Sequence, residues 1–147
     1  MPIILSSATL DRMLAAPAYE DLVWIAGILA GCSRYDPEAP TYGLPEVAFG
    51  LVERLTWFAQ GVRSGVWTYF EATPLPCQNA MLAILQADAA HPEFQQTYET
   101  GMRDWRTPSA LTAVDAWMDA NDDRNTRILW DLVAANRTLL QGLVNTA

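Results

Sequence analysis

Hydrophobic positions along the chain recur mainly at helical spacing. The clearest stripe comprises Val47, Leu51, Leu55, Phe58 and Val62, which recur every three or four residues and therefore share one helical face. Alternating apolar and polar runs, which are typical of half-buried strands, are nearly absent. The pattern predicts an all-α fold, a bundle of about six or seven helices.

Prolines and polar clusters divide this pattern into segments. Pro17 ends a short first helix, and three prolines within 33–45 predict a loop. Residues 66–70 fit a helix or a strand by periodicity, and we favour a helix because no other segment offers a strand partner. The segment 19–32 is apolar around most of its circumference, which predicts a central helix. The longer helices are expected over about 7–14, 19–32, 45–62, 76–85, 92–105, 108–118 and 121–144.

The length of 147 residues predicts one domain spanning 1–147. An apolar content of 51% is that of a folded globule rather than a disordered chain. The net charge is -8, and all nine basic residues are Arg. This charge argues against direct binding to nucleic acids or anionic membranes, because both bind through basic patches. The longest apolar segment, 22–32, is about half the ~20 residues of a membrane span, and no signal sequence is evident, so a cytoplasmic protein is expected.

Few side chains suggest catalysis. His91 is the only histidine, it precedes a proline at an expected helix start, and neither Cys32 nor Cys77 shares a metal-ligand spacing with it. Both cysteines lie in apolar surroundings, where reduced, buried thiols are common. No glycine-rich phosphate loop, nucleophile elbow or paired-cysteine zinc motif is present. The sequence therefore predicts no enzyme, no cofactor and no metal site.

Acidic residues gather near the expected junction of the last two helices. If 108–118 and 121–144 were one helix, Asp115, Asp119, Asp122 and Asp123 would lie on one face, opposite Leu111, Val114 and Met118. They would span ~12 Å, a charge spacing comparable with the ~3.4 Å of one DNA strand. The interpretation we favour is a solvated helix face followed by Asp caps at the start of the last helix.

Aromatic residues are of two kinds. Trp24, Trp57 and Trp130 lie within apolar helical stretches and are expected in the core. Others, Trp105 among them, flank breaks or loops and are typical of contact surfaces, where Trp and Tyr dominate binding. Together with the acids, the residues expected to contact a partner are Tyr35, Asp36, Glu38, Tyr42, Trp67, Tyr69, Asp115, Asp119, Asp122 and Asp123.

Residues 51–71, LVERLTWFAQGVRSGVWTYFE, resemble a bacterial all-helical family of unknown function. That family places an acidic helix before an Asn-Gly-Gly-Phe turn and a Gln-Tyr-Phe helix start, and it includes an acidic DNA-mimic protein. Gly65, Tyr69 and Phe70 match this pattern. The resemblance implies a helical fold and an acidic binding surface, with no catalytic residues. The positions that depart from the pattern are Gln60, Arg63, Ser64 and Val66.

Charge and resemblance together predict an interaction protein that binds and blocks a basic partner. It could be an immunity or antitoxin-type inhibitor of a toxin, or a DNA mimic acting on a nucleic-acid-binding protein. The alternative is a small-molecule-binding or enzymatic helical domain that uses carboxylates and His91. A homodimer formed through Leu139 and Leu143 is a further possibility.

Overall fold

A computed structural model describes residues 4–31 and 38–146, which form an all-α fold. The described residues contain eight helices and no strand, so the predicted fold class is confirmed with one or two helices more than expected. The predicted helix at 66–70 forms as α4, which begins at Trp67, directly after Val66. The helices are α1 (Ser7–Ala15), α2 (Tyr19–Gly31), α3 (Glu46–Ser64), α4 (Trp67–Ala72), α5 (Leu75–Ala87), α6 (Pro92–Asp104), α7 (Pro108–Ala135) and α8 (Arg137–Asn145).

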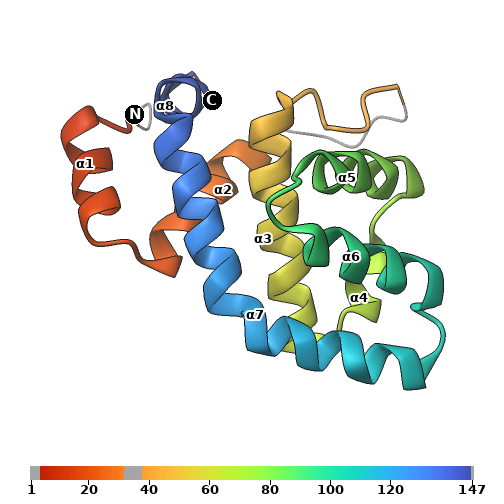
Figure 1. The fold of residues 1–147 in the computed structure, drawn as a ribbon. Helices are drawn as coiled ribbons and strands as arrows, with labels where there is room; N and C mark the ends of the chain where they lie inside the picture. The colour runs from red at the N-terminus through yellow and green to blue at the C-terminus, as the bar shows by residue number, and fades with distance from the viewer. Residues whose placement is uncertain (1–3, 32–37, 147) are drawn as a thin grey trace.

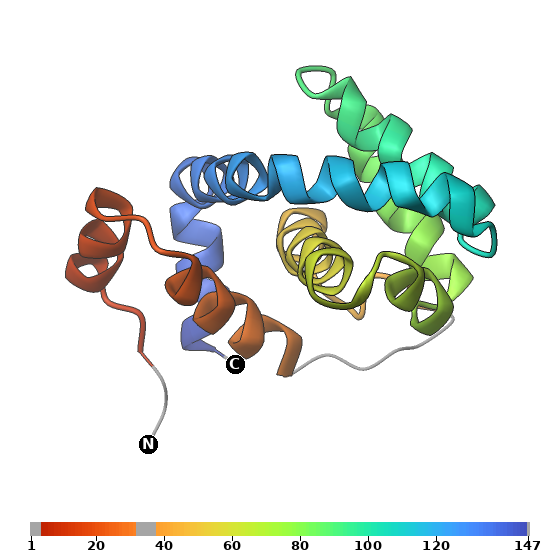
Figure 2. The same ribbon diagram turned by 90° about the horizontal axis from the view of Figure 1, so that it is seen from below.

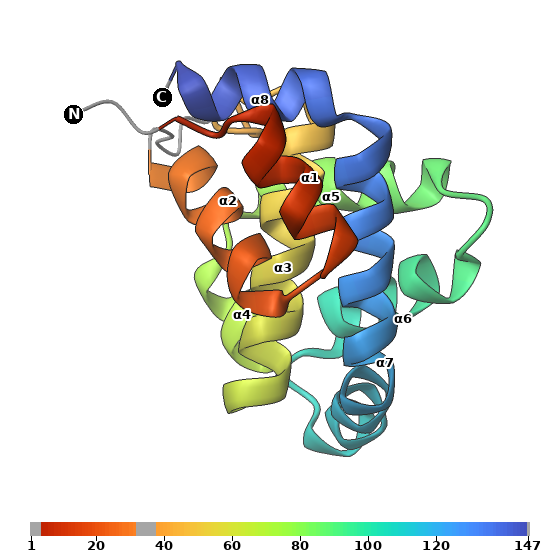
Figure 3. The ribbon, with the colours of Figure 1, turned by 90° about the vertical axis from the view of Figure 1, so that its left-hand side faces the viewer.

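Helices α3 and α7 form the centre of the molecule, with the other helices on two sides (Figure 1). Figure 2 shows α7 lying across α3 and extending from the side of α1, α2 and α8 to the side of α4, α5 and α6. Figure 3 shows α1, α2 and α8 covering the first of these sides. This arrangement makes α3 and α7 the common wall of two groups of helices.

Each side has its own apolar cluster, and α3 contributes to both. Leu51 and Leu55 pack with residues of α1, α2, α8 and the C-terminal half of α7. Trp57 and Phe58 pack with residues of α4, α5, α6 and the N-terminal half of α7. Because α3 has partners on most of its circumference, even Glu53 and Arg54 are buried.

The predicted break at 121–123 is wrong, because α7 continues through it to Ala135. The Asn121 side chain donates to the carbonyl of Trp117 at 2.8 Å, within the helix, instead of capping a new one. Such bonds to the preceding turn often bend a helix, and Figure 1 shows α7 bent near its middle. The break falls instead at Asn136, whose side-chain amide donates to the carbonyl of Leu132 at 2.9 Å.

Helix α2 is not central, contrary to the prediction. Only its Leu22, Ile25, Ala26 and Leu29 are buried, whereas Trp24, predicted to be in the core, is 39% exposed. One apolar face of α2 therefore packs in the core, and its other apolar face is not covered by the described residues. Among residues 4–31 and 38–146, no helix combines the length and apolarity needed to cross a membrane.

Replacement of Gly101 tests how tightly α6 packs on α4. An alanine Cβ at this position would overlap the ring of Phe70 and lie 3.0 Å from its Cζ atom. Because that ring is buried and packed against the rings of Tyr69 and Tyr98, we expect Gly101→Ala to lower the free energy of unfolding by about 1–3 kcal/mol in urea denaturation.

The matched control is Gly142→Ala in α8. A Cβ there meets nothing within 4 Å, so the better helix propensity of alanine should raise stability by up to ~1 kcal/mol. Equal responses of the two variants would contradict the close packing of α6 on Phe70.

Candidate functional site

The structure brings some of the ten predicted contact residues together and separates others. Tyr35 and Asp36 lie outside the described residues. Four acids lie along the middle of α7, and Trp67 lies next to the first of them. Glu38 and Tyr42 precede α3, whereas Tyr69 is in the core. The middle of α7 is therefore the candidate site.

Asp119, Asp122 and Asp123 form an acidic cluster on successive turns of α7. Asp119 and Asp123 are exposed and Asp122 is half-buried. Burial raises the pKa of Asp122, and the negative charges of Asp123 and Asp119 raise it further. None of the salt bridges between described residues involves these three carboxylates. The cluster is therefore negative, and no described cation forms an ion pair with it.

The nearest arginine in sequence, Arg124, does not neutralise this cluster. Its guanidinium forms an ion pair with Glu93 of α6 and lies 5.3 Å from the ring centroid of Phe94. A backbone hydrogen bond of Glu93 lowers the pKa of its carboxyl group, and the contact with Arg124 lowers it further. Helical geometry thus directs Arg124 toward α6, while its neighbour Asp123 faces solvent.

Asp115 differs from the other three acids because it has a structural partner. Its Oδ1 accepts a hydrogen bond of 2.8 Å from the backbone N–H of Val66, a fully buried residue between α3 and α4. At about 100° per residue, Asp115 and Asp122 lie beside the Leu111 and Met118 stripe rather than opposite it. This position explains why both are half-buried.

Trp67 and Asp115 line one pocket at the N-terminal end of α7. The pocket has a volume of about 410 Å³ and is also lined by Trp105, Arg106 and Leu111. Trp67 is 45% exposed, and the Arg106 guanidinium lies 4.3 Å from the ring centroid of Trp105. The pocket offers aromatic surface and one charge of each sign directly before the acidic cluster.

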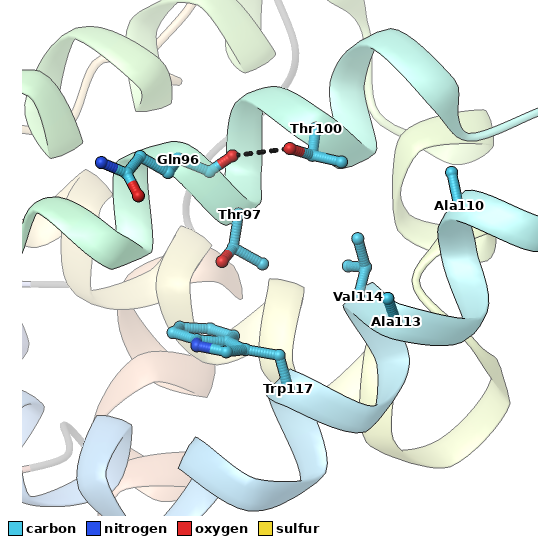
Figure 4. A pocket seen from close by; sticks show the side chains of 7 residues that line it. All are labelled: Gln96, Thr97, Thr100, Ala110, Ala113, Val114 and Trp117. Atoms are coloured by element: carbon cyan, nitrogen blue, oxygen red, sulfur yellow. Dashed lines mark hydrogen bonds between the residues drawn. The ribbon is translucent and has the colours of Figure 1, made fainter.

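A second pocket of about 410 Å³ lies between α6 and α7 (Figure 4). Figure 4 shows Thr97 and Trp117 facing each other across it, with Val114 beyond. The Thr100 hydroxyl donates to the carbonyl of Gln96 at 3.0 Å. All seven side chains that line this pocket are uncharged, so it contributes nothing to the acidic surface.

Glu38 and Tyr42 lie away from the acidic cluster, at the opposite end of α3 from Gly65. The ring centroid of Tyr42 is 5.8 Å from that of Phe49, and its hydroxyl bonds with the buried thiol of Cys77. Since α3 is about 28 Å long, these residues do not share a surface with Asp115.

The prediction of a contact role for Tyr69 is wrong, because its side chain is only 1% exposed. Its hydroxyl donates to Oε1 of Glu53 at 2.7 Å and lies 2.8 Å from the hydroxyl of Tyr98. Burial raises the pKa of both tyrosines and of Glu53. Because Tyr69 lies close to a predicted break between helices, the sequence favoured an exposed position and gave no sign of its buried partner, Glu53 on α3.

A second network, buried at Arg54 and Asn125, joins α3 to α7 and to the segment between α5 and α6. Its Nε donates to Oδ1 of Asn125 at 3.3 Å, and its Nη1 lies 3.6 Å from Asp88. Asp88 is also 2.9 Å from Nδ1 of His91, the residue that precedes α6. Among the described residues, no group of three His, Cys, Asp or Glu side chains could hold a metal ion. These contacts give His91 a structural partner.

Alanine substitution separates Asp115 from its acidic neighbours. Asp115→Ala leaves the buried N–H of Val66 without an acceptor, so we expect the free energy of unfolding to fall by about 1–3 kcal/mol. Asp119→Ala should change it by less than about 0.5 kcal/mol, because that side chain is exposed. Urea denaturation of both variants tests this difference, and equal stabilities would refute the structural role of Asp115.

Glu53 should make stability depend on pH. Because its pKa is raised above 4.5, the folded protein retains a proton that the unfolded chain has lost, so the free energy of unfolding falls as pH rises through the raised pKa. Glu53→Gln keeps an oxygen for the Tyr69 hydroxyl and cannot ionise, so its stability should decline less above pH 4.5. Exposed Glu71→Gln is the control, and parallel pH profiles for the two variants would contradict the assignment.

Comparison of the chain with protein-family models, with curated protein sequences and with solved structures found no match. The resemblance of residues 51–71 to the helical family therefore stays a prediction.

Proposed function

We propose that this protein is an acidic interaction protein that binds and blocks a basic surface on another protein. The observation that carries the proposal is the cluster of Asp119, Asp122 and Asp123 on the continuous helix α7, with no cation paired to it among the described residues. Trp67 is exposed and lines a pocket with Asp115, which precedes the cluster on α7, and exposed tryptophans are frequent anchors in interfaces.

The electrostatics of the cluster favour a cationic partner. The raised pKa of Asp122 means that its charged form is disfavoured in the free protein, by burial and by Asp123 and Asp119. An arginine or lysine placed among the three carboxylates would relieve this repulsion. The net charge of -8 would in addition speed the encounter with a basic protein, an effect that weakens as salt increases.

Two kinds of partner fit this chemistry, a basic toxin or a nucleic-acid-binding protein. Along the axis of the continuous helix α7, the four acids from Asp115 to Asp123 span ~12 Å, a spacing comparable to the ~3.4 Å of phosphates along one DNA strand, and Asp119 and Asp123 are the exposed members. This spacing and the resemblance of residues 51–71 support a DNA mimic. An immunity or antitoxin-type inhibitor would use the same acids against a basic active site.

Neutralisation of the cluster tests the proposal. We expect Asp119→Asn/Asp122→Asn/Asp123→Asn to lose basic proteins that the unmodified protein retains in a low-salt pull-down, because the attraction comes from these carboxylates. The control Glu46→Gln/Glu71→Gln/Asp131→Asn also removes three exposed negative charges and should retain them. Equal losses in both variants, or no basic protein captured at low salt, would refute the proposal.

A further inference from the structure

A groove between α2 and α3 has no occupant among the described residues. Its volume is about 440 Å³, and its walls include Tyr19, Val23 and Gly27 of α2 and Leu55, Ala59 and Arg63 of α3. On each helix these residues are four or eight positions apart, so each wall is one helical face. Figures 2 and 3 show α2 and α3 as neighbouring helices.

The α2 wall of the groove carries exposed apolar side chains and a glycine that contacts within the described structure do not explain. Val23 is 44% exposed and Tyr19 is 39% exposed, although both lie on a helix of high apolar content. Gly27 is a poor helix former in the interior of α2, yet a Cβ at this position would meet nothing within 4 Å. Internal packing therefore does not require a glycine here, whereas the close approach of another chain would.

The shape of the groove fits a helix. Two packed helices present ridges of side chains at spacings of four residues, and a third helix places its own ridge between them. Amphipathic helices bind such grooves with apolar anchors at spacings of three, four and seven residues. The small residues Gly27 and Ala59 on opposite walls leave room for the backbone of a bound helix.

Charge decides between a second copy of this chain and a different protein. Arg63 is the only charged residue among the described residues that line the groove. Two acids lie beside its Tyr19 end, because burial raises the pKa of Tyr19, the charge of Asp122 raises it further, Arg63 lowers it and Glu20 raises it. Two copies, each with a net charge of -8, would repel each other at such a contact. A helix with basic side chains would instead be attracted.

We propose that the α2/α3 groove binds an amphipathic helix of the partner, with the apolar face of that helix against Val23 and Gly27 and a basic end near Asp122 and Glu20. This inference rests on the proposed function, because it adds an apolar contact to the acidic cluster of the same binding protein. Asp122 belongs to both regions, since its charge acts on Tyr19 in the groove and on the cluster of α7.

Gly27→Leu tests the groove without disturbing the fold. The leucine would fill open space in the groove and replace a poor helix former by a good one, so the thermal midpoint should not fall. Gly142→Leu is the matched control, because Gly142 is also an exposed helical glycine with nothing within 4 Å of a Cβ, and it does not line the groove.

The probe is a fluorescein-labelled synthetic helix of about 18 residues with leucine and alanine on one face and arginine on its flanks. In fluorescence anisotropy we expect the unmodified protein and Gly142→Leu to bind it equally, and Gly27→Leu to bind it at least ~10-fold more weakly, since a blocked central contact dominates affinity. The same peptide with glutamate in place of arginine should bind at least ~10-fold more weakly to the unmodified protein.

Three results would overturn the inference. The first is an affinity of Gly27→Leu for the arginine peptide equal to that of the unmodified protein. If Asp119→Asn/Asp122→Asn/Asp123→Asn still loses binding in that case, the proposed function stands and only the groove is excluded. The second is equal binding of the arginine and glutamate peptides. The third is a dimer in sedimentation equilibrium that Gly27→Leu abolishes, which would assign the groove to a second copy of the chain. Absence of binding by both the peptide and basic proteins would refute the proposed function as well.

Discussion

The packing of α7 along α3 is the contact on which the rest of the structure depends. Each half of α7 closes one of the two apolar clusters, and α3 forms the opposite wall of both. The buried bond between Arg54 and Asn125 lies in this contact, and Nη2 of the same guanidinium has no hydrogen-bond partner among residues 4–31 and 38–146. Since a buried guanidinium is costly unless it is paired, this bond disfavours other registers of α7 on α3.

The position of the candidate site follows from this packing. The core stripe of α7 turns Asp115 toward the junction of α3 and α4, where it accepts the Val66 N–H, and leaves Asp119 and Asp123 in solvent. Asp122 lies at the border of the two environments, which raises its pKa. The same helix thus provides the core contacts and the acidic cluster, so the cluster is held on a rigid element rather than on a loop.

Sequence reasoning was most successful where a local signal determines the structure. Prolines mark the starts of α6 and α7, and the apolar stripe of 47–62 forms α3, because both signals act within a turn or two of helix. It failed at 121–123, where Asn and Asp are good caps by local preference, but the apolar stripe from Met118 to Leu129 keeps the helix intact against α3. It also failed for Tyr69, because the partner that buries its hydroxyl, Glu53, lies 16 residues away on another helix.

The distribution of arginines explains how a modest excess of acids becomes a local negative surface. Of the described arginines, Arg54, Arg103, Arg124 and Arg137 have acidic partners, and none of these partners is Asp119, Asp122 or Asp123. Arg124 lies within the acidic stretch of the sequence, but its turn toward Glu93 and Phe94 removes its charge from the outer face. A count of acidic and basic residues along 115–127 would therefore overestimate how far the arginines neutralise the acidic cluster. Because an exposed charge acts over about 8–10 Å at physiological salt, this local arrangement determines the field that a partner meets once it is close to α7.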